Sequence, residues 1–360
     1  MRTIPKQSVT PPERCARRTL HCFYNTRYLS RCRLKHAPFD AGPFSHYSLP
    51  VSMKLLSRRD FLAVAGVTAL GLVARPAWLR AATLPAITRA IPASGERLPV
   101  IGLGTSRTFD VAPDSDQLAQ LLPVLQAFFE HGGGVIDTSP MYGHAEAVLG
   151  KLLRAAPYDR KRLFAATKVW TWGRDAGVQQ MQESMRLTGI ERFDLIQIHN
   201  LRDWQVHLET LREWKQQGKV RYIGITTSHG RDHEELALAL ETSPFDFVQL
   251  SYNIANREVE RRLLPLAQER AIAVLANRPF QRGALFQSVR NKALPDWAAE
   301  FDCTSWAQFF LKFVVSHPAV TCAIPASSKV NHLVDNMAAG TGRLPDAAMR
   351  KRMVALIGQI

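Results

Sequence analysis

Residues 134–169 read GVIDTSPMYGHAEAVLGKLLRAAPYDRKRLFAATKV and contain the pattern that decides the fold. Two short apolar runs, at 134–138 and 163–169, enclose a stretch at 146–154 whose apolar residues recur every three to four positions. That spacing predicts an amphipathic helix between two buried strands. Two strands joined by a helical crossover lie parallel in one sheet. The segment therefore predicts a strand–helix–strand unit.

The same alternation continues on both sides of this segment. Further strand-like runs lie at 100–104, 193–199, 222–226, 245–252, 271–276 and 320–325. Further helical patterns lie at 178–187, 206–217, 234–241, 258–270 and 305–315. Eight strands in the 278 residues after position 82 fit one (β/α)8 TIM barrel of roughly 250 residues. We therefore predict an α/β fold with a single barrel domain over residues 84–360.

A doubly wound dinucleotide-binding sheet is the competing architecture. Gly102-Leu103-Gly104 follows a strand-like run, but position 107 is Arg where the G-x-G-x-x-G fingerprint requires Gly. A doubly wound sheet also normally has fewer strands than eight. The barrel is therefore the better prediction.

The positive charge of the chain is concentrated in its first 82 residues. The formal net charge is +15, and residues 1–82 hold fourteen of the 46 Lys and Arg residues but only three acidic ones. The remainder has no basic tract and no basic residues interleaved with aromatic ones, which argues against a nucleic-acid-binding function. The basic excess belongs to a leader.

Residues 53–82 resemble a secretory signal of the twin-arginine class. Arg58 and Arg59 precede an uncharged apolar stretch at 61–73, and small residues follow at 74–82. The apolar stretch is shorter than the ~20 residues that span a bilayer, so no stable membrane anchor is expected. We expect the twin-arginine export machinery to carry the folded protein to the periplasm or otherwise out of the cytoplasm.

The chain before this signal has no periodic apolar pattern that could form a core. We expect residues 1–52 to be a non-native or disordered extension, Met53 to be the true start, and cleavage to fall between Ala77 and Leu84. After cleavage only Cys303 and Cys322 would remain, without C-x-x-C spacing, so neither a disulfide framework nor a cysteine metal site is expected.

Polar residues close three successive strand-like runs. Asp137 ends the first, Tyr142 follows five residues later, Lys168 ends the second and His199 ends the third. Separately, each has a structural explanation: a turn cap, a packed ring, a solvated lysine or a structural histidine. Because barrel enzymes place catalytic groups at the carboxyl ends of their strands, the four together predict an active site.

These four side chains suit the reduction of a carbonyl group. Hydride addition leaves an alkoxide that must be protonated, and Tyr142 can be the general acid. An ammonium about 4 Å away is worth ~4 kcal/mol at an effective dielectric of ~20, or roughly 3 pKa units. We therefore expect Lys168 to lower the pKa of Tyr142, Asp137 to keep Lys168 charged, and His199 to donate a hydrogen bond to the carbonyl.

A series of short motifs resembles the aldo-keto reductase family from about Leu98 to Ala339. In chain order they are Gly102-Leu103-Gly104-Thr105, Asp137-Thr138-Ser139 with Tyr142-Gly143, Thr167-Lys168, Gln197-Ile198-His199, Gly224-Ile225-Thr226, Gln249 with Tyr252-Asn253, and Ile324-Pro325. The resemblance implies a catalytic tetrad of Asp137, Tyr142, Lys168 and His199. It also implies a small carbonyl substrate and a nicotinamide cofactor, NADP(H) rather than NAD(H), extended across the barrel mouth.

By this resemblance Gln249 holds the nicotinamide carboxamide, but two neighbouring strand ends depart from the family. Thr226 and Thr227 stand where the family usually has Ser and Asn, and Asn277 stands where it has a tyrosine that stacks on the nicotinamide. Carboxamide binding is expected to persist through these residues, whereas the stacking contact is expected to be lost.

The resemblance also places the 2′-phosphate and adenine near the last strand. Ser327, Ser328 and Lys329 match the phosphate-binding segment, His332 replaces an arginine, and Asn336 is expected near the adenine. We expect only a modest preference for NADPH.

Two other sets of residues have alternative explanations. Trp170, Trp172 and Trp204 follow the catalytic strand ends, and either form apolar walls of the substrate pocket or pack at the barrel rim. His229, His233 and Glu234 would not share one face, because Gly230 and a helix start lie between the histidines, so no metal site is expected.

Two other functions compete with this enzyme. A non-catalytic nucleotide-binding barrel, acting as a regulatory or partner subunit, would not need the intact tetrad. A metal-dependent isomerase barrel would need several acidic or histidine ligands at strand ends, where only the carboxylate of Asp137 is well placed. The last expected helix begins at Asp346 and a short tail follows, so we expect an open, permissive pocket.

Overall fold

The computed structural model of the protein describes residues 85–360. The predicted extension at 1–52 and the predicted signal at 53–82 lie outside these residues and remain predictions. Among residues 85–360, no helix has the length and apolar character needed to cross a membrane.

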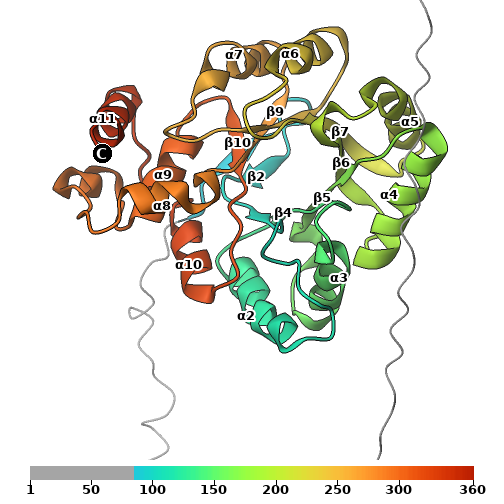
Figure 1. The fold of residues 1–360 in the computed structure, drawn as a ribbon, viewed down its shortest axis with the longest axis horizontal. Coiled ribbons are helices and arrows are strands. Elements are labelled where there is room, and N and C mark those ends of the chain that lie inside the picture. The colour runs from blue at the N-terminus through green and yellow to red at the C-terminus, as the bar shows by residue number, and fades with distance from the viewer. Residues whose placement is uncertain (1–84) are drawn as a thin grey trace, which may run out of the picture. The chain divides into compact units, whose positions relative to one another are not determined.

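Eight parallel strands form one sheet in which each strand pairs with the next in the chain (Figure 1). Their bounds are β3 (Leu103–Gly104), β4 (Val135–Asp137), β5 (Phe164–Val169), β6 (Phe193–Ile198), β7 (Val220–Thr226), β8 (Phe247–Ser251), β9 (Ala273–Asn277) and β10 (Val320–Ala323). Parallel bridges from Ile101 to Ala323 and from Gly104 to Ala326 join the first strand to the last. The sheet therefore closes on itself as a barrel.

Glycine is required where the barrel closes. A Cβ on Gly104 would lie 2.8 Å from the carbonyl oxygen of Ile324, too close for any side chain. Gly104 therefore allows the first and last strands to pack closely.

A helix follows each strand and lies on the outside of the barrel (Figure 1). These helices are α2 (Asp116–Glu130), α3 (Ala145–Ala155), α4 (Arg174–Thr188), α5 (Trp204–Gln216), α6 (His233–Thr242), α7 (Leu263–Glu269), α9 (Trp306–Val315) and α10 (Val330–Ala338). Two additional helices are α8 (Ala284–Ser288) and α11 (Ala347–Gly358). Short 3-10 helices are η2 (Arg160–Arg162), η3 (His199–Leu201), η4 (Glu258–Glu260), η5 (Gln281–Gly283) and η6 (Asp296–Phe301). The predicted (β/α)8 barrel is confirmed.

One predicted helix is divided in two. The pattern at 258–270 predicts a single helix, but η4 and α7 are separated at Arg262, whose φ of −139° and ψ of −52° are not helical. Pro265 explains the break, because it has no N–H to donate to an upstream carbonyl and is tolerated only in a first helical turn.

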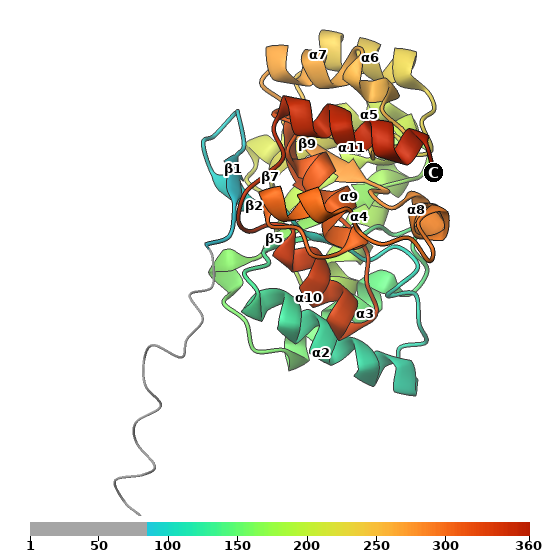
Figure 2. The same cartoon turned by 90° about the vertical axis from the view of Figure 1, so that its left-hand side faces the viewer.

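A β-hairpin closes the amino-terminal end of the barrel. Strands β1 (Thr88–Ala90) and β2 (Arg97–Pro99) pair antiparallel, and in Figure 2 they lie at the opposite end of the molecule from α8. Ile91 and Leu98 are buried in one cluster with inward-facing strand residues, among them Phe164 and Phe247. The strands of this hairpin are only three residues long, too short to give a periodic pattern in the sequence, so the hairpin was not predicted.

Helix α11 is attached to the outside of the barrel by a polar network. Asp346 caps its amino end by accepting a hydrogen bond from the Met349 backbone N–H at 2.8 Å. Arg350 donates to the Tyr252 hydroxyl at 2.6 Å and forms an ion pair with Glu260 at 3.0 Å. These contacts hold the helix against η4 and the loop after β8.

Candidate active site

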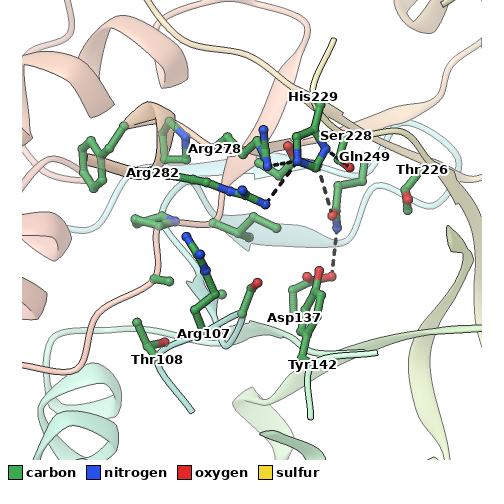
Figure 3. A pocket seen from close by; sticks show the side chains of 18 of the residues that line it. Arg107, Thr108, Asp137, Tyr142, Thr226, Ser228, His229, Gln249, Arg278 and Arg282 are labelled. Atoms are coloured by element: carbon green, nitrogen blue, oxygen red, sulfur yellow. Dashed lines mark hydrogen bonds between the residues drawn. The ribbon is translucent and has the colours of Figure 1, made fainter. Parts of the chain in front are cut away.

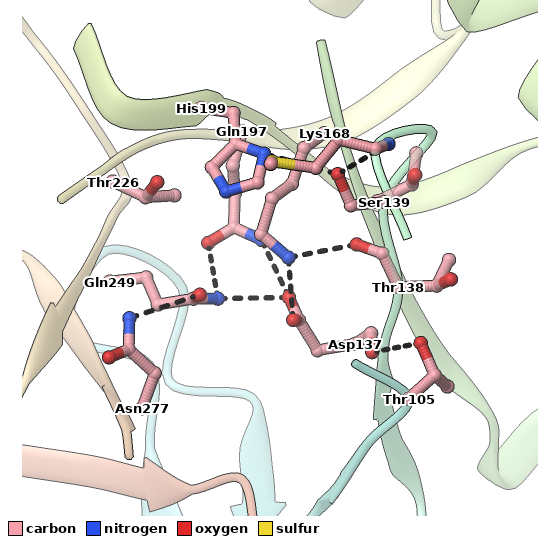
Figure 4. A network of polar contacts seen from close by, with 12 residues as sticks. Thr105, Asp137, Thr138, Ser139, Lys168, Gln197, His199, Thr226, Gln249 and Asn277 are labelled. Atoms are coloured by element: carbon pink, nitrogen blue, oxygen red, sulfur yellow. Dashed lines mark hydrogen bonds and ion pairs between the residues drawn. The ribbon is translucent and has the colours of Figure 1, made fainter. Parts of the chain in front are cut away.

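A buried ion pair lies at the carboxyl ends of β4 and β5. Lys168 Nζ donates to Asp137 Oδ2 at 2.6 Å and to the backbone carbonyl of Thr138 at 2.8 Å, and both charged side chains are almost fully excluded from solvent (Figure 4). Burial alone would lower the pKa of Lys168, but Asp137 and Tyr142 together raise it above its ordinary value. Lys168 therefore carries a positive charge, as its pairing with Asp137 predicts.

Two glutamine amides hold the other oxygen of Asp137. Gln197 Nε2 and Gln249 Nε2 each donate to Asp137 Oδ1 at 2.9 Å, and Gln249 Nε2 also lies 3.1 Å from Gln197 Oε1 (Figure 4). Charged groups inside a protein need such hydrogen bonds as well as an opposite charge. Gln197 lies on β6, two residues before His199, and its contact with Asp137 was not predicted from the sequence.

Tyr142 lies beside this ion pair. Lys168 Nζ is 5.0 Å from the centre of the phenol ring, and the ring meets the His199 imidazole edge-on at 5.9 Å. Lys168 lowers the pKa of Tyr142, as expected, but the expectation that this effect outweighs burial is wrong. Burial raises the pKa of Tyr142 more than Lys168 lowers it, and the carboxylate of Asp137 opposes Lys168. Consequently, the phenol is protonated at neutral pH.

His199 is buried in an electropositive position. Its Nδ1 lies 3.1 Å from the Ser139 hydroxyl, which can donate to that nitrogen and leave Nε2–H free to donate toward the cavity. Burial, reinforced by the charges of Lys168 and Arg202, lowers the pKa of His199 to about 2. The imidazole is therefore neutral. Ser139 was part of a family motif in the sequence, but its contact with His199 was not predicted.

A cavity of about 550 Å³ opens above these residues at the carboxyl ends of the strands (Figure 3). Asp137, Tyr142, His199, Gln249 and Asn277 all line it. Lys168 is fully buried behind them. Within residues 85–360, no three His, Cys, Asp or Glu side chains are grouped so that they could hold a metal ion.

The strand ends expected to hold a nicotinamide lie together on one side of the cavity. Thr226 lines it and accepts a hydrogen bond from the Asn200 backbone at 3.1 Å. Asn277 Nδ2 lies 3.4 Å from Gln249 Oε1. In the described part of the chain, the buried hydroxyl of Thr227 has no hydrogen-bond partner. Thr227 does not line the cavity, so the polar groups open to a ligand carboxamide are those of Thr226, Gln249 and Asn277.

The segment expected to hold the adenosine end follows the cavity wall. Ile324 to Ala326 line the cavity, and the chain then enters α10 with Lys329 as its N-cap. Ser328, Lys329 and His332 are exposed beyond that wall. In contrast, Ser327 and Asn336 are buried, and Ser327 Oγ bonds to the Lys329 backbone. None of these five residues lines the cavity itself.

The three tryptophans have different environments. The Arg202 guanidinium lies over Trp170 at 4.0 Å and over Trp172 at 5.4 Å, and Trp170 is 6.5 Å from the His199 ring. Trp204 instead is buried against Phe245 at 6.5 Å. Trp170 therefore lies near His199 and Trp204 packs in the core, but none of the three tryptophans lines the cavity.

Three arginines that the sequence analysis did not single out also line the cavity. They are Arg107, Arg278 and Arg282, from the loops after β3 and β9 (Figure 3). His229 Nε2 contacts Arg278 and lies 3.1 Å from Arg282 Nη2. Burial, Arg282 and Arg107 lower the pKa of Arg278 to about 10. Arg278 could have been noticed in the sequence, because it directly follows the expected strand end at Asn277.

The fold and these contacts define a class of protein. A closed barrel of eight parallel strands holds a buried Lys–Asp pair, a protonated phenol and a neutral imidazole around one cavity at its carboxyl end, which is the arrangement of a barrel enzyme that supplies a proton to its substrate. The chain belongs to the aldo/keto reductase family, since residues 100–352 match the sequence model of that family.

Individual relatives agree with this assignment. Methylglyoxal reductase YeaE of Escherichia coli is 29% identical over 248 residues, which cover 67% of this chain and 85% of that one. The NADH-specific methylglyoxal reductase of Escherichia coli is 25% identical over 199 residues, covering 46% of this chain and 58% of that one. An aldo/keto reductase of Klebsiella pneumoniae, solved with NADP and acetate, matches with a TM-score of 0.62 and 28% identity over 73% of this chain and 93% of that one.

The family assignment confirms the enzyme class predicted from the sequence. The protein is an NAD(P)H-dependent oxidoreductase built on a TIM barrel. The alternative of a non-catalytic nucleotide-binding barrel is not favoured.

Proposed function

We propose that the protein reduces an aldehyde or small ketone to the corresponding alcohol, with Tyr142 as the general acid. The observation that carries this proposal is the fully buried ion pair between Lys168 and Asp137, 2.6 Å long and placed directly behind the phenol. A buried pair of this kind costs desolvation energy, so its position next to a cavity calls for a function.

Each member of the tetrad has one role in the proposed reaction. Asp137 holds Lys168 in its charged form, and the ammonium stabilises the phenolate that Tyr142 becomes when it gives up its proton. His199, neutral and held by Ser139, donates from Nε2 to the substrate carbonyl and orients it. A reduced nicotinamide supplies the hydride to the carbonyl carbon when it is bound.

The proposed nicotinamide site consists of Thr226, Thr227, Gln249 and Asn277. Both Gln249 amide hydrogens point at Asp137 and Gln197, so a carboxamide would bond through its own N–H to Gln249 Oε1 and replace the long contact from Asn277. Since Asn277 has no aromatic ring, this site binds the nicotinamide by hydrogen bonds instead of stacking.

We propose a modest preference for NADPH over NADH. Ser328 and Lys329 are exposed at the amino end of α10, where a 2′-phosphate could meet the lysine and backbone N–H groups. Ser327 is bonded to the Lys329 backbone, and Asn336 is buried further along the helix. His332 supplies no permanent charge. The descriptions of the relatives mention both cofactors. One structure contains NADP, and one reductase is described as NADH-specific.

The direct test is a screen of carbonyl compounds under consumption of NADPH and NADH by the purified protein. Two relatives are named methylglyoxal reductases, so 2-oxoaldehydes are the first compounds to test. We expect turnover that Tyr142→Phe abolishes, with His332→Arg shifting the cofactor ratio toward NADPH. Binding of either cofactor without turnover of any carbonyl would instead support the non-catalytic alternative.

We also propose export through the twin-arginine route to the periplasm. Arg58 and Arg59 before a short apolar stretch support this proposal, as does the fact that this route carries folded proteins.

A further inference from the structure

Glu146 is a buried carboxyl group outside the tetrad. It lies in the first turn of α3, is almost fully excluded from solvent, and forms no ion pair with any basic side chain of residues 85–360. Burial raises the pKa of Glu146 above its ordinary value, because a carboxylate is less stable away from water. A carboxyl group kept in such a position costs stability, so its contacts call for a function.

Each oxygen of Glu146 accepts a hydrogen bond from a different element. Thr167 Oγ1, on β5, donates to Glu146 Oε1 at 2.6 Å, and Ser184 Oγ, on α4, donates to Glu146 Oε2 at 2.9 Å. Both residues that donate are fully buried. Among residues 85–360, the bond from Thr167 is the single side-chain hydrogen bond between α3 and β5. The carboxyl group therefore joins α3 to the sheet on one side and to α4 on the other.

The bond between Thr167 and Glu146 joins the elements that position the proton donor and the ammonium. Lys168 follows Thr167 on β5, and successive strand residues face opposite sides of a sheet, so Lys168 reaches the ion pair inside the barrel while Thr167 faces α3. Tyr142 lies just before α3, and its carbonyl accepts a hydrogen bond at 3.1 Å from the N–H of Ala145, the first residue of that helix. The contact therefore ties the start of the helix beside the phenol to the strand end that holds the ammonium.

We propose that Glu146 is a positioning residue that fixes the separation between the Tyr142 phenol and the Lys168 ammonium. This inference rests on the proposed function, in which the ammonium stabilises the phenolate that forms as the proton is transferred. The attraction between these two charges depends on their distance. An increase from about 4 Å to about 5 Å would slow the reaction about fourfold at an effective dielectric constant of about 20. A carboxyl group that holds helix and strand together outside the barrel therefore affects the rate without touching substrate or cofactor.

The two hydroxyl contacts of Glu146 supply a matched pair of substitutions. Glu146 itself is retained, because its removal would leave two buried hydroxyls without an acceptor. Thr167→Val removes the bond to β5 and keeps the shape of the side chain, whereas Ser184→Ala removes the bond to α4. Each variant loses one buried hydrogen bond to the same carboxyl group, so both should have a lower melting temperature. Only Thr167→Val should move α3, because α3 and α4 also pack closely at Gly150, where a Cβ would lie 2.2 Å from the carbonyl oxygen of Leu187.

The experiment combines steady-state kinetics with NADPH and a reducible aldehyde, below the unfolding transition, with crystal structures of both variants. We expect Thr167→Val to lower kcat about fourfold with unchanged KM. The distance from Lys168 Nζ to the centre of the Tyr142 ring, 5.0 Å in the wild type, should be longer in this variant. Ser184→Ala should change neither quantity. Thr167→Ser keeps the hydroxyl and should restore the wild-type kcat.

A purely structural role for Glu146 predicts that Thr167→Val and Ser184→Ala have the same kcat. That result, or an unchanged distance between Lys168 and Tyr142 in Thr167→Val, would overturn the proposal. If the wild type reduces no carbonyl compound, the proposed function fails and the crystal structures alone decide. A longer separation in Thr167→Val but not in Ser184→Ala would then still support positioning by Glu146, and the same separation in all three proteins would refute it.

Discussion

The hydroxyl of Tyr142 lies among groups that act on its pKa in opposite directions. Burial and the carboxylate of Asp137 raise the pKa, and the ammonium of Lys168 lowers it by a smaller amount. The phenol therefore holds its proton until negative charge develops on the substrate oxygen. Only at that moment does the stabilisation of a phenolate by Lys168 contribute to the rate.

This dependence predicts a non-additive pair of substitutions. Tyr142→Phe should lower kcat by at least about 100-fold, the size expected for loss of a positioned general acid, while leaving cofactor affinity unchanged. Lys168→Met should act in the same direction, and the double variant should be little worse than the worse single one. Steady-state kinetics and cofactor titration of the three variants measure this. Losses that multiply would show that the two residues act independently and would contradict the proposed tetrad.

The neutral state of His199 predicts a pH dependence of stability. Its pKa is lowered to about 2 in the folded protein, against about 6.5 in an unfolded chain, so below pH 6.5 the unfolded state binds a proton that the folded state does not. Stability contributed by this residue is thus complete above about pH 6.5 and falls with pH by at most about 1.4 kcal/mol per unit. Urea unfolding at pH 7.5 and pH 5 should show wild type losing about 2 kcal/mol more than His199→Gln. Equal losses would mean that His199 is protonated in the folded protein. His317, whose pKa is lowered to about 4, contributes a similar slope to both proteins and cancels in the comparison.

The proposed tetrad could be picked out in the sequence because Asp137, Lys168 and His199 lie at the ends of strands that the apolar pattern locates, and Tyr142 follows Asp137 closely. The three arginines that line the cavity could not, because Arg107, Arg278 and Arg282 lie in the connections after β3 and β9, where they adopt left-handed backbone angles that no apolar spacing encodes. The direction of the pKa shift at Tyr142 could not be predicted from the sequence either, because it depends on how completely the folded barrel buries the phenol.

At the scale of single elements, the eight strands were predictable and the β1–β2 hairpin was not. Each barrel strand contains a run of apolar residues, for example at β6 and β8, because it is buried on both faces. The hairpin contributes mainly Ile91 and Leu98 to the core, which is too little for a periodic signal. The break before α7 was not predicted, because it is caused by the single residue Pro265 and leaves the apolar spacing of the segment unchanged.

The hairpin predicts a large loss of stability without loss of catalytic chemistry. Ile91 is fully buried at the end of the barrel away from the catalytic cavity, so Ile91→Ala should destabilise the fold by about 2–5 kcal/mol while kcat of the folded enzyme is unchanged. Chemical denaturation and kinetics below the unfolding transition measure the two effects. Leu238→Ala on the exposed surface of α6 is the control and should have little effect on stability. A fall in kcat for Ile91→Ala would show that the hairpin supports the geometry of the strand ends.

At the scale of the whole molecule, the proposed signal at residues 53–82 predicts that the enzyme works in the periplasm. Replacing Arg58 and Arg59 together by Lys should retain the protein in the cytoplasm, because recognition by the twin-arginine machinery depends on that pair. Cell fractionation followed by immunoblotting measures the distribution, with Arg75→Lys as a control within the same leader. Unchanged periplasmic accumulation of the double variant would contradict this route of export.

The hairpin that closes the barrel also determines where ligands enter and leave the cavity. With Ile91 and Leu98 filling the lower end, ligands that bind above Asp137 arrive and depart through the same opening. A nicotinamide bonded to Gln249 would lie deep in this opening, with the carbonyl compound between it and solvent, so the cofactor would bind first and dissociate last. Product-inhibition kinetics would then show the oxidised dinucleotide competing with its reduced form alone.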